Sequence, residues 1–506
     1  MWRAVWGAVA VAALGWWIYG GTLGFPFVYD DEVNITQNAG IRVGGPLGWG
    51  GLRLWSPTPR PVANASLALN FAWGGYAVEG YRSLNVWIHV WTSWLVGLLC
   101  WQVLSRCGEL PGQRGMSLSS RSRFVLSLFS GLLFVSHPLA TQSVVYVVQR
   151  MTSLSVLFYV AGLCAWIGGG RLSGSGRWGL RGLACVLGLL SLGSKEIGAT
   201  FPVVLWLWEW GFERDGSRAY LSRSLPWLGG FVGSLLVLSW WYASGDPLSG
   251  YASKPFTLWE RLWTEPRVWW RYVSLSLLPL PGRLSVIHDV EMSSGPWSPW
   301  TTWLSWGSWL ALLWWGWRRR WGLRLCSALV VWWLLQQQVE GSFLPLEPLY
   351  EHRTYLPLVG VMVVLPWGFW RLLEWGLGRR WGTRWGVAVG VCVVLGLSLA
   401  AHDRAQVWGD PVTLWQDALD KAPRHRAARV NYGVALLQAG RYEEARAAFA
   451  DAVRRHPESF VAHRSLGAIA VVERRFDEAE PHFRAALERQ PFDPMSWAGL
   501  GTVAME

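Results

Sequence analysis

Residues 2–32 read WRAVWGAVAVAALGWWIYGGTLGFPFVYDDE. In this stretch a run of acids follows an apolar segment that is long enough to cross a bilayer. Many apolar segments come later in the chain, so we expect this one to remain as a first transmembrane helix rather than to be cleaved as a signal peptide. Carboxylates beside a lipid phase are solvated, paired or functional. Asp30 and Asp31 are therefore the leading candidates for chemistry, and a solvated loop that only ends the helix is the alternative.

The composition predicts an integral membrane protein. Of the 506 residues, 52% are hydrophobic and only 15% are charged, whereas soluble proteins carry about 25% charged residues. The net charge of +12 comes from arginines in short loops between apolar segments. That distribution is typical of cytoplasmic loops rather than of a nucleic-acid-binding face, so we expect no nucleic acid partner. The six cysteines are scattered and show neither a disulfide framework nor a metal-type spacing.

Hydropathy predicts an all-α polytopic bundle of about 11 transmembrane helices. The arginine-rich loops all fall on one side if these helices alternate in direction, and we expect that side to be cytoplasmic together with the N-terminus. The candidate segments lie near residues 2–24, 84–105, 124–140, 151–169, 182–194, 199–212, 225–243, 298–317, 322–338, 355–373 and 385–401.

Polar groups from distant parts of the chain are expected on the opposite face. A shared pocket at that face would explain why they converge there. The segment 258–280 is apolar but interrupted by charges, which predicts an amphipathic helix on the membrane surface. Such a helix could cover a groove for a lipid tail or serve only as an interfacial anchor. The polar groups on this face are Asp30–Glu32, His137-Pro138, Lys195-Glu196 and Glu351–Arg353.

The C-terminal part has a repeat of about 34 residues, the period of the tetratricopeptide helix–turn–helix unit. Asn431-Tyr432-Gly433 returns as Ser465-Leu466-Gly467, and Phe449 returns as Phe483. We therefore predict a transmembrane domain over residues 1–402 and an α-solenoid of tetratricopeptide repeats over residues 403–506. The concave face of such an array binds protein or peptide partners, and a structural plug is the alternative.

Taken together, these features resemble the transmembrane and tetratricopeptide-repeat O-mannosyltransferases, within the membrane-embedded C-type glycosyltransferase superfamily, and a bacterial-type member in particular. The residues that carry the resemblance are Asp30–Glu32, Arg60-Pro61, Tyr81, Asn85, His89, His137-Pro138, Gln149-Arg150, Ser194–Glu196, Tyr350–Pro357, Arg404 and Trp408.

The resemblance implies transfer of a sugar, with a mannose-like hexose favoured, from a polyprenyl-phosphate donor. The acceptor would lie outside the cytoplasm, with Ser or Thr of a protein favoured, and the protein would sit in a bacterial inner membrane. An acid after the first span, here Asp30 or Asp31, would act as catalytic base in an inverting reaction. We expect no required cofactor, although a divalent cation held by these two acids is a second option.

The leaving polyprenyl phosphate needs cations. We rank Arg353 first, then Lys195, then Arg150, although each could instead form a structural ion pair or contact lipid headgroups. No metal-ligand pattern of histidines or carboxylates is apparent. Two other functions are considered: a non-enzymatic scaffold that recruits envelope proteins through its repeats, and a transporter, for which repeated halves are not seen. The remaining predicted pocket residues are Glu32, His137, Glu196, Glu351 and His352.

Overall fold

The computed structural model describes residues 2–42, 60–109, 118–214, 217–242, 248–318 and 324–506. Within these ranges the chain forms helices and no β-strand, as the all-α prediction requires. The chain divides into two compact units. The first comprises residues 1–284 with 290–406, and the second comprises residues 285–289 with 407–506. The predicted domain boundary at 402/403 lies inside helix α13 (Tyr355–Gln406).

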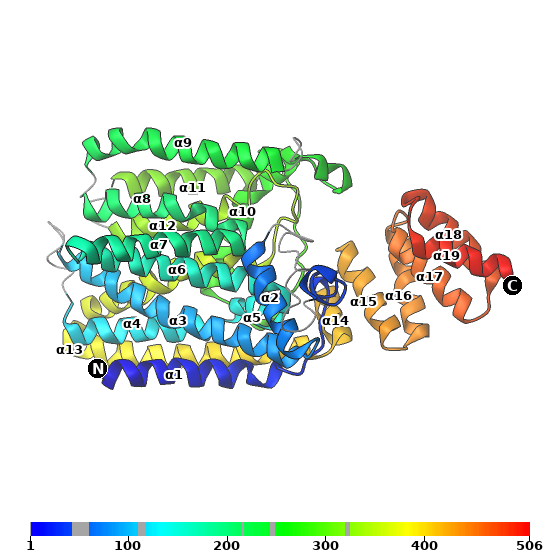
Figure 1. The fold of residues 1–506 in the computed structure, drawn as a ribbon, viewed down its shortest axis with the longest axis horizontal. Coiled ribbons are helices and arrows are strands. Elements are labelled where there is room, and N and C mark those ends of the chain that lie inside the picture. Colours follow the sequence, from blue (N-terminus) through cyan, green and yellow to red (C-terminus); the bar gives the residue numbers. More distant parts are fainter. Residues whose placement is uncertain (1, 43–59, 110–117, 215–216, 243–247, 319–323) are drawn as a thin grey trace. The chain divides into compact units, whose positions relative to one another are not determined.

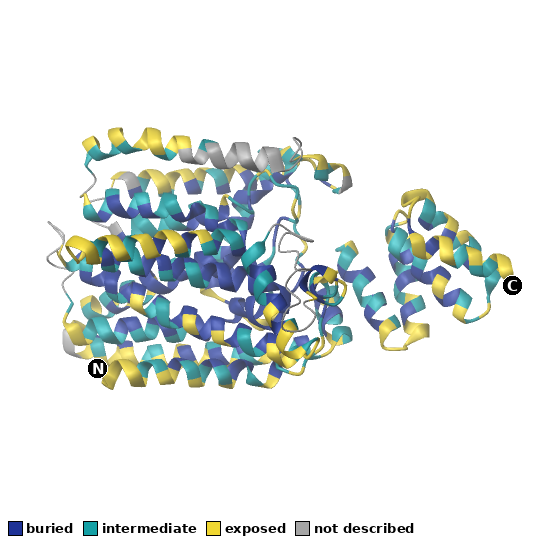
Figure 2. Ribbon diagram, viewed as in Figure 1, coloured by how far each residue is buried: buried dark blue, intermediate teal, exposed yellow. Residues whose placement is uncertain are grey.

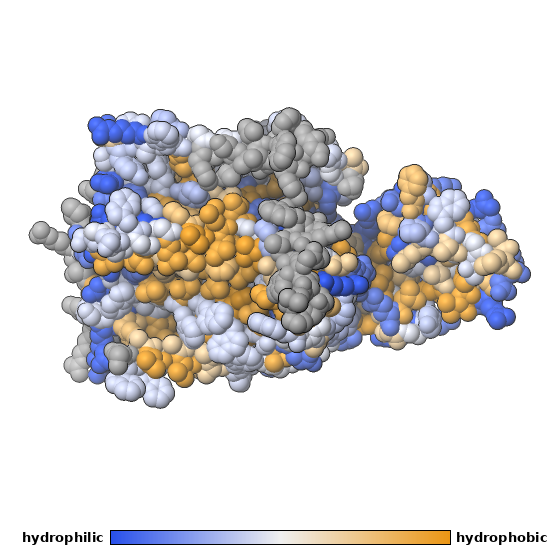
Figure 3. Space-filling view, viewed as in Figure 1, coloured by the Kyte–Doolittle hydropathy of each residue, from blue (hydrophilic) through white to orange (hydrophobic). Residues whose placement is uncertain are grey.

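The first unit is a helical bundle. Its long helices run side by side in Figure 1, and the short helices α2 and α5 lie at one end of them. Buried residues concentrate in the centre of this bundle (Figure 2), and an apolar band covers the flank that Figure 3 presents. The remaining helices are α1 Trp2–Tyr19, α2 Pro61–Gly74, α3 Val78–Glu109, α4 Ser120–Val135, α5 Thr141–Val145, α6 Arg150–Gly170, α7 Gly174–Ser194, α8 Phe201–Trp208, α9 Arg218–Tyr242, α10 Leu258–Leu277, α11 Thr301–Arg318 and α12 Arg324–Gln337.

Several helices of this unit can cross a membrane, so the protein is a multi-pass membrane protein. Among the described residues, 5 helices are long and apolar enough, or up to 6 if the bent pair α4 and Pro138–Val145 is one span. The other predicted segments form α7, α8, α9, α11 and α12, so they are helical. The count of about 11 spans, made from hydropathy, stays a prediction. The 5 spans are Trp2–Thr22, Val78–Glu109, Val147–Gly170, Glu351–Gly378 and Trp381–Gly409.

Helix α13 contains two of these spans. Gly378 separates them with a φ of 73°, in the left-handed region that glycine adopts without steric cost. The predicted amphipathic segment forms α10, which begins with a capping box between Thr257 and Glu260. Its position on a membrane surface stays a prediction.

Helices α3 and α4 approach each other through glycines. A Cβ at Gly97 would lie 2.9 Å from the carbonyl oxygen of Ser127, and one at Gly131 would lie 2.9 Å from that of Ser93. Small residues allow membrane helices to pack backbone against backbone, because lipid provides no hydrophobic drive for association. The two contacts are reciprocal and fix this pair of helices closely.

The second unit has the predicted helical repeat. Phe449 is fully buried in one helix pair, and a Cβ at Gly433 would lie 2.7 Å from its ring. Phe483 and Gly467 repeat this contact in the next pair. Its helices are α14 Pro411–Lys421, α15 Arg426–Gln438, α16 Tyr442–Arg455, α17 Phe460–Val472, α18 Phe476–Arg489 and α19 Pro494–Met505.

The glycine contact between α3 and α4 predicts a position-specific loss of stability. The change Gly97→Leu places a side chain where only a hydrogen fits, and overpacking of this kind costs at least about 1–3 kcal/mol. The matched control is Gly229→Leu on α9, because no atom lies within 4 Å of a Cβ at that position. Thermal denaturation of the purified protein in detergent should show a lower melting temperature for Gly97→Leu alone. Equal melting temperatures would contradict the close packing of these helices.

Candidate functional site

Asp31 is a buried anchor for the loop after α1. Its Oδ1 accepts the N–H of Val148 at 2.7 Å, and its Oδ2 accepts the N–H of Val28 at 3.1 Å. Burial raises the pKa of Asp31 to about 7, although the two N–H groups act in the opposite direction. Because both oxygens already bind backbone groups, Asp31 ties this loop to the start of the span at 147–170.

Asp30 is more accessible than Asp31. Its N–H donates to the hydroxyl oxygen of Tyr146 at 2.9 Å, and the Tyr146 hydroxyl is also hydrogen-bonded to the Asp30 carboxylate. Burial raises the pKa of Asp30, and the bond from Tyr146 opposes that rise. The preceding residue, Tyr29, has a φ of 55°, which is uncommon for a residue other than glycine and is found disproportionately at functional sites.

Tyr350 joins the acid to the predicted cations. Its hydroxyl is hydrogen-bonded to that of Tyr29, its ring stacks on His352 at 5.3 Å between centroids, and the guanidinium of Arg353 lies 5.3 Å from its ring centroid. Burial raises the pKa of Tyr350, and the nearby carboxylate of Asp30 adds to this rise. The structure therefore brings Tyr29, the neighbour of Asp30, to the same tyrosine as His352 and Arg353 in one cluster, although they are far apart in sequence.

Lys195 belongs to the same cluster through an ion pair that the sequence did not indicate. Its Nζ lies 2.9 Å from Oε1 of Glu340 and 2.9 Å from Oγ1 of Thr152. Burial favours neutral Glu340, but the positive charges of Lys195 and Arg353 outweigh it and lower the pKa of Glu340 to about 2. The Glu340 carboxylate thus remains ionised beside the cations.

The ion pair of Lys195 does not involve its sequence neighbour Glu196. Glu196 instead binds Arg60, with Nη2 to Oε2 at 3.0 Å. His352 interacts electrostatically with Lys195, Glu340 and Arg60, so the two ion pairs are neighbours. Sequence reasoning assigned no site role to Glu340 or Arg60; an acid after an apolar helix was the only signal for Glu340.

Arg150 is engaged by the fold itself. Its Nε donates to Asn85 at 2.7 Å, its Nη1 to Asn70 at 2.5 Å, and its Nη2 to the carbonyl of Tyr81 at 2.8 Å. The guanidinium is fully buried and holds α2 and α3 together. Its predicted contact with phosphate has no support in this geometry.

The other predicted pocket residues have mixed surroundings. His137 is buried, with Nε2 3.1 Å from the carbonyl oxygen of Ser276 and Nδ1 accepting the N–H of Leu139, which is a structural role. Glu351 is buried beside the cluster, and Glu32 is half-buried at the start of the short helix Glu32–Thr36. Among the described residues, no group of three or more His, Cys, Asp or Glu could hold a metal ion.

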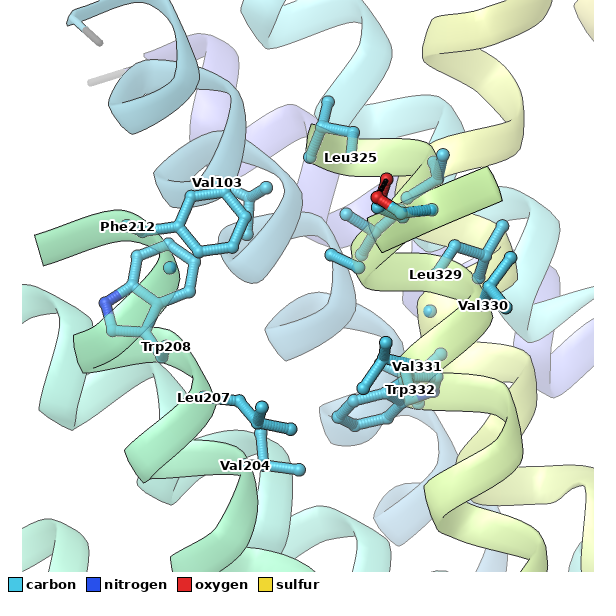
Figure 4. Close-up of a pocket in the computed structure, with 18 of the residues that line it drawn as sticks. Val103, Val204, Leu207, Trp208, Phe212, Leu325, Leu329, Val330, Val331 and Trp332 are labelled. Carbon is cyan, nitrogen blue, oxygen red and sulfur yellow. Dashed lines mark hydrogen bonds between the residues drawn. The ribbon is translucent and has the colours of Figure 1, made fainter. Parts of the chain in front are cut away.

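An apolar cavity of about 560 Å³ lies inside the bundle. Figure 4 shows Val204, Leu207 and Trp208 on one side of it and Leu329 and Trp332 on the other. The wall is built from α3, α6, α8, α11, α12 and α13 together with the turn Glu209–Glu213.

Helix α12 leads from this cavity toward the charged cluster. Trp332 lines the cavity, and Gln336, one turn later, accepts a hydrogen bond from Thr200 at 2.8 Å. Glu340 follows after another turn and pairs with Lys195. The apolar cavity and the charged cluster therefore lie along a single helix and the residues that follow it.

Comparison with known proteins supports both parts of the architecture. The tetratricopeptide repeat model matches residues 412–460, 436–494 and 464–506. The chain is 30% identical to protein O-mannosyl-transferase Tmtc1 of Drosophila melanogaster, over 38% of this chain and 21% of that protein. It is 31% identical to protein O-mannosyl-transferase tmtc2 of Xenopus laevis, over 31% of this chain and 18% of that protein. It is 29% identical to protein O-mannosyl-transferase TMTC4 of Homo sapiens, over 34% of this chain and 25% of that protein. The chain thus spans a quarter or less of the length of these relatives. No solved structure matches.

The ion pair of Lys195 and Glu340 predicts a non-additive pair of substitutions. The change Glu340→Gln leaves a cation that is 3% exposed without its carboxylate, and such a loss costs about 3–5 kcal/mol. The double change Lys195→Met with Glu340→Leu should recover most of that stability. Melting temperatures of the purified variants test this, with Glu444→Gln in the exposed pair with Arg441 as a control that should not change. If the double variant lost as much stability as the two single changes together, the two residues would not be coupled.

Proposed function

We propose that this chain, a homologue of the transmembrane and tetratricopeptide-repeat O-mannosyltransferases, is a membrane glycosyltransferase that acts on proteins. It would move a mannose-like hexose from polyprenyl phosphate to a hydroxyl group of a protein outside the cytoplasm. The observation that carries this proposal is the cluster in which Tyr350 joins Asp30 to Arg353 and His352. An acid and phosphate-binding cations in one cluster are what this transfer requires.

Asp30 is the better candidate for the base. Asp30 is exposed, whereas both oxygens of Asp31 are taken by backbone N–H groups. In a single displacement the acceptor oxygen forms a bond to the anomeric carbon while the bond from that carbon to the phosphate oxygen breaks. The electron pair leaves with polyprenyl phosphate, and Asp30 takes the hydroxyl proton, so the configuration inverts. The negative charge of the carboxylate also favours an oxocarbenium-like transition state.

Arg353 and Lys195 would bind the departing phosphate. Two carbonyls, of Glu347 and Pro348, accept hydrogen bonds from Nη1 of Arg353, but its buried Nε has no partner among the described residues. That donor is available for a phosphate oxygen. Lys195 adds a point charge, and its pair with Glu340 keeps the ammonium group in place.

The apolar cavity would accommodate the isoprenoid tail of the donor. Its lining is almost entirely aliphatic and aromatic, and it is connected to Lys195 along α12. The arginine-rich loops support an N-terminus in the cytoplasm and repeats outside it. A bacterial inner membrane is part of the same proposal. The repeat unit would then bind the acceptor protein.

The assignment of Asp30 predicts a specific loss of activity. Asp30→Asn should reduce transfer by about 10²–10⁴-fold, because general base catalysis supplies a factor of this size. The assay incubates purified protein with synthetic polyprenyl-phosphate mannose and a Ser/Thr peptide, and it measures released polyprenyl phosphate by mass spectrometry. The control Asp403→Asn removes an exposed acid and should keep wild-type activity. Full activity in both Asp30→Asn and Asp31→Asn would end the assignment and favour the scaffold function.

The Tyr146 hydrogen bond predicts a shift in the pH profile. Asp30 accepts a proton only when it is ionised, so kcat/KM should rise with pH through its raised pKa and then level off. Tyr146→Phe removes a group that lowers this pKa, so the inflection should move to higher pH. The pH dependence of polyprenyl phosphate release measures the inflection, and Asp403→Asn should leave it unchanged. An unmoved inflection in Tyr146→Phe would mean that another group titrates.

A further inference from the structure

Residues 341–350, here called the strap, connect the end of α12 to α13 without forming a helix. Both ends of the strap adjoin the cluster. Glu340 lies immediately before it and pairs with Lys195, and Tyr350 ends it beside Arg353. The placement of the strap therefore sets the positions of the cations relative to the acid at Asp30.

One side chain of α10 binds two backbone carbonyls of the strap and the carbonyl of Glu340 just before it. Nε of Arg261 donates to the carbonyl of Ser342 at 2.9 Å, Nη2 donates to that of Glu340 at 2.8 Å, and Nη1 donates to that of Leu346. Irregular backbone needs donors for its carbonyls, because it lacks the bonds that a helix supplies. Arg261 is 0% exposed, so water cannot replace these bonds.

The charge of Arg261 is compensated one helical turn later. Glu265 lies 2.8 Å from its Nη2 and is itself 2% exposed. A buried cation is costly unless it is paired and hydrogen-bonded, and here both conditions are met. The carboxylate also contacts the strap, because a Cβ at Gly341 would lie 3.1 Å from Oε2 of Glu265 and 2.8 Å from the carbonyl oxygen of Gln337. Only glycine allows this approach without a shift of the backbone.

We infer that Arg261 is a positioning residue for the transfer reaction, because it holds the strap where the Glu340–Lys195 pair and the hydrogen bond of Tyr350 to Tyr29, the residue before Asp30, exist together. This inference rests on the proposed function. A guanidinium presents five N–H donors in a planar fork, whereas an ammonium group presents three from one point. Lysine therefore cannot bind all three carbonyls, of Glu340, Ser342 and Leu346, and the inference concerns arginine specifically.

The test compares Arg261→Lys and Arg261→Met with Arg267→Met in the full-length protein. Arg267 is the matched control because it also lies on α10 and donates to Glu291 and Ser293, which lie outside the strap. Hydrogen–deuterium exchange of the peptide 338–350 should be about tenfold faster in both Arg261 variants. Release of polyprenyl phosphate should show kcat reduced by about 10–100-fold with little change in KM. Arg267→Met should match the wild type in both measurements.

The strap side supplies an independent variant. Gly341→Ala should speed hydrogen–deuterium exchange of the peptide 338–350 and lower kcat, as Arg261→Lys does. This variant decides the outcome if Arg261→Met does not fold. The inference would be overturned if Arg261→Lys had the wild-type kcat and the peptide 338–350 exchanged at the wild-type rate. Faster exchange across the whole bundle, with kcat falling only as the folded fraction falls, would also overturn it. Absence of transfer by the wild-type protein would instead reject the proposed function, and the exchange result would still show whether Arg261 holds the strap.

Discussion

The buried carboxylate of Asp31 determines where the neighbouring acid can be. It binds the N–H groups of Val28 and Val148, so the loop after α1 is joined to the start of the next long span. Arg82 strengthens the same junction, since it donates to the carbonyls of Pro26 and Val145. A buried charge that lost these partners would be costly. With the loop held in this way, Asp30 lies against Tyr146, and the geometry of the candidate site follows.

Buried arginines hold the irregular parts of this bundle. Arg82 binds the loop after α1, Arg150 binds the ends of α2 and α3, and Arg261 binds the strap. For Arg82 and Arg261 the acceptors are backbone carbonyls of irregular segments, whereas Arg150 binds groups within the two helices themselves. The planar fork of the guanidinium suits this role, because it can reach several carbonyls at once. In a sequence such residues cannot be distinguished from phosphate ligands, and Arg150 is an example.

The architecture was predictable because it depends on patterns that are local in sequence. Apolar length predicts helices that must lie in lipid, and the recurrence of Phe449 as Phe483 predicts stacked helix pairs. The amphipathic character of 258–280 predicted α10 for the same reason. The number of spans stays a prediction, since apolar helices such as α8 and α12 match the hydropathy pattern but are shorter than the 5 candidate spans.

Sequence alone determined that this is a helical membrane protein with a repeat domain, and it marked Asp30, Arg353 and Lys195 as groups that a membrane-embedded chain must pair or use. Only the tertiary structure decided their partners. Lys195 pairs with Glu340 rather than with its neighbour Glu196, and Tyr350 brings Arg353 to Asp30. Ion pairs and hydrogen bonds depend on distances of a few ångströms between residues that are remote in sequence, and no pattern along the chain specifies those distances.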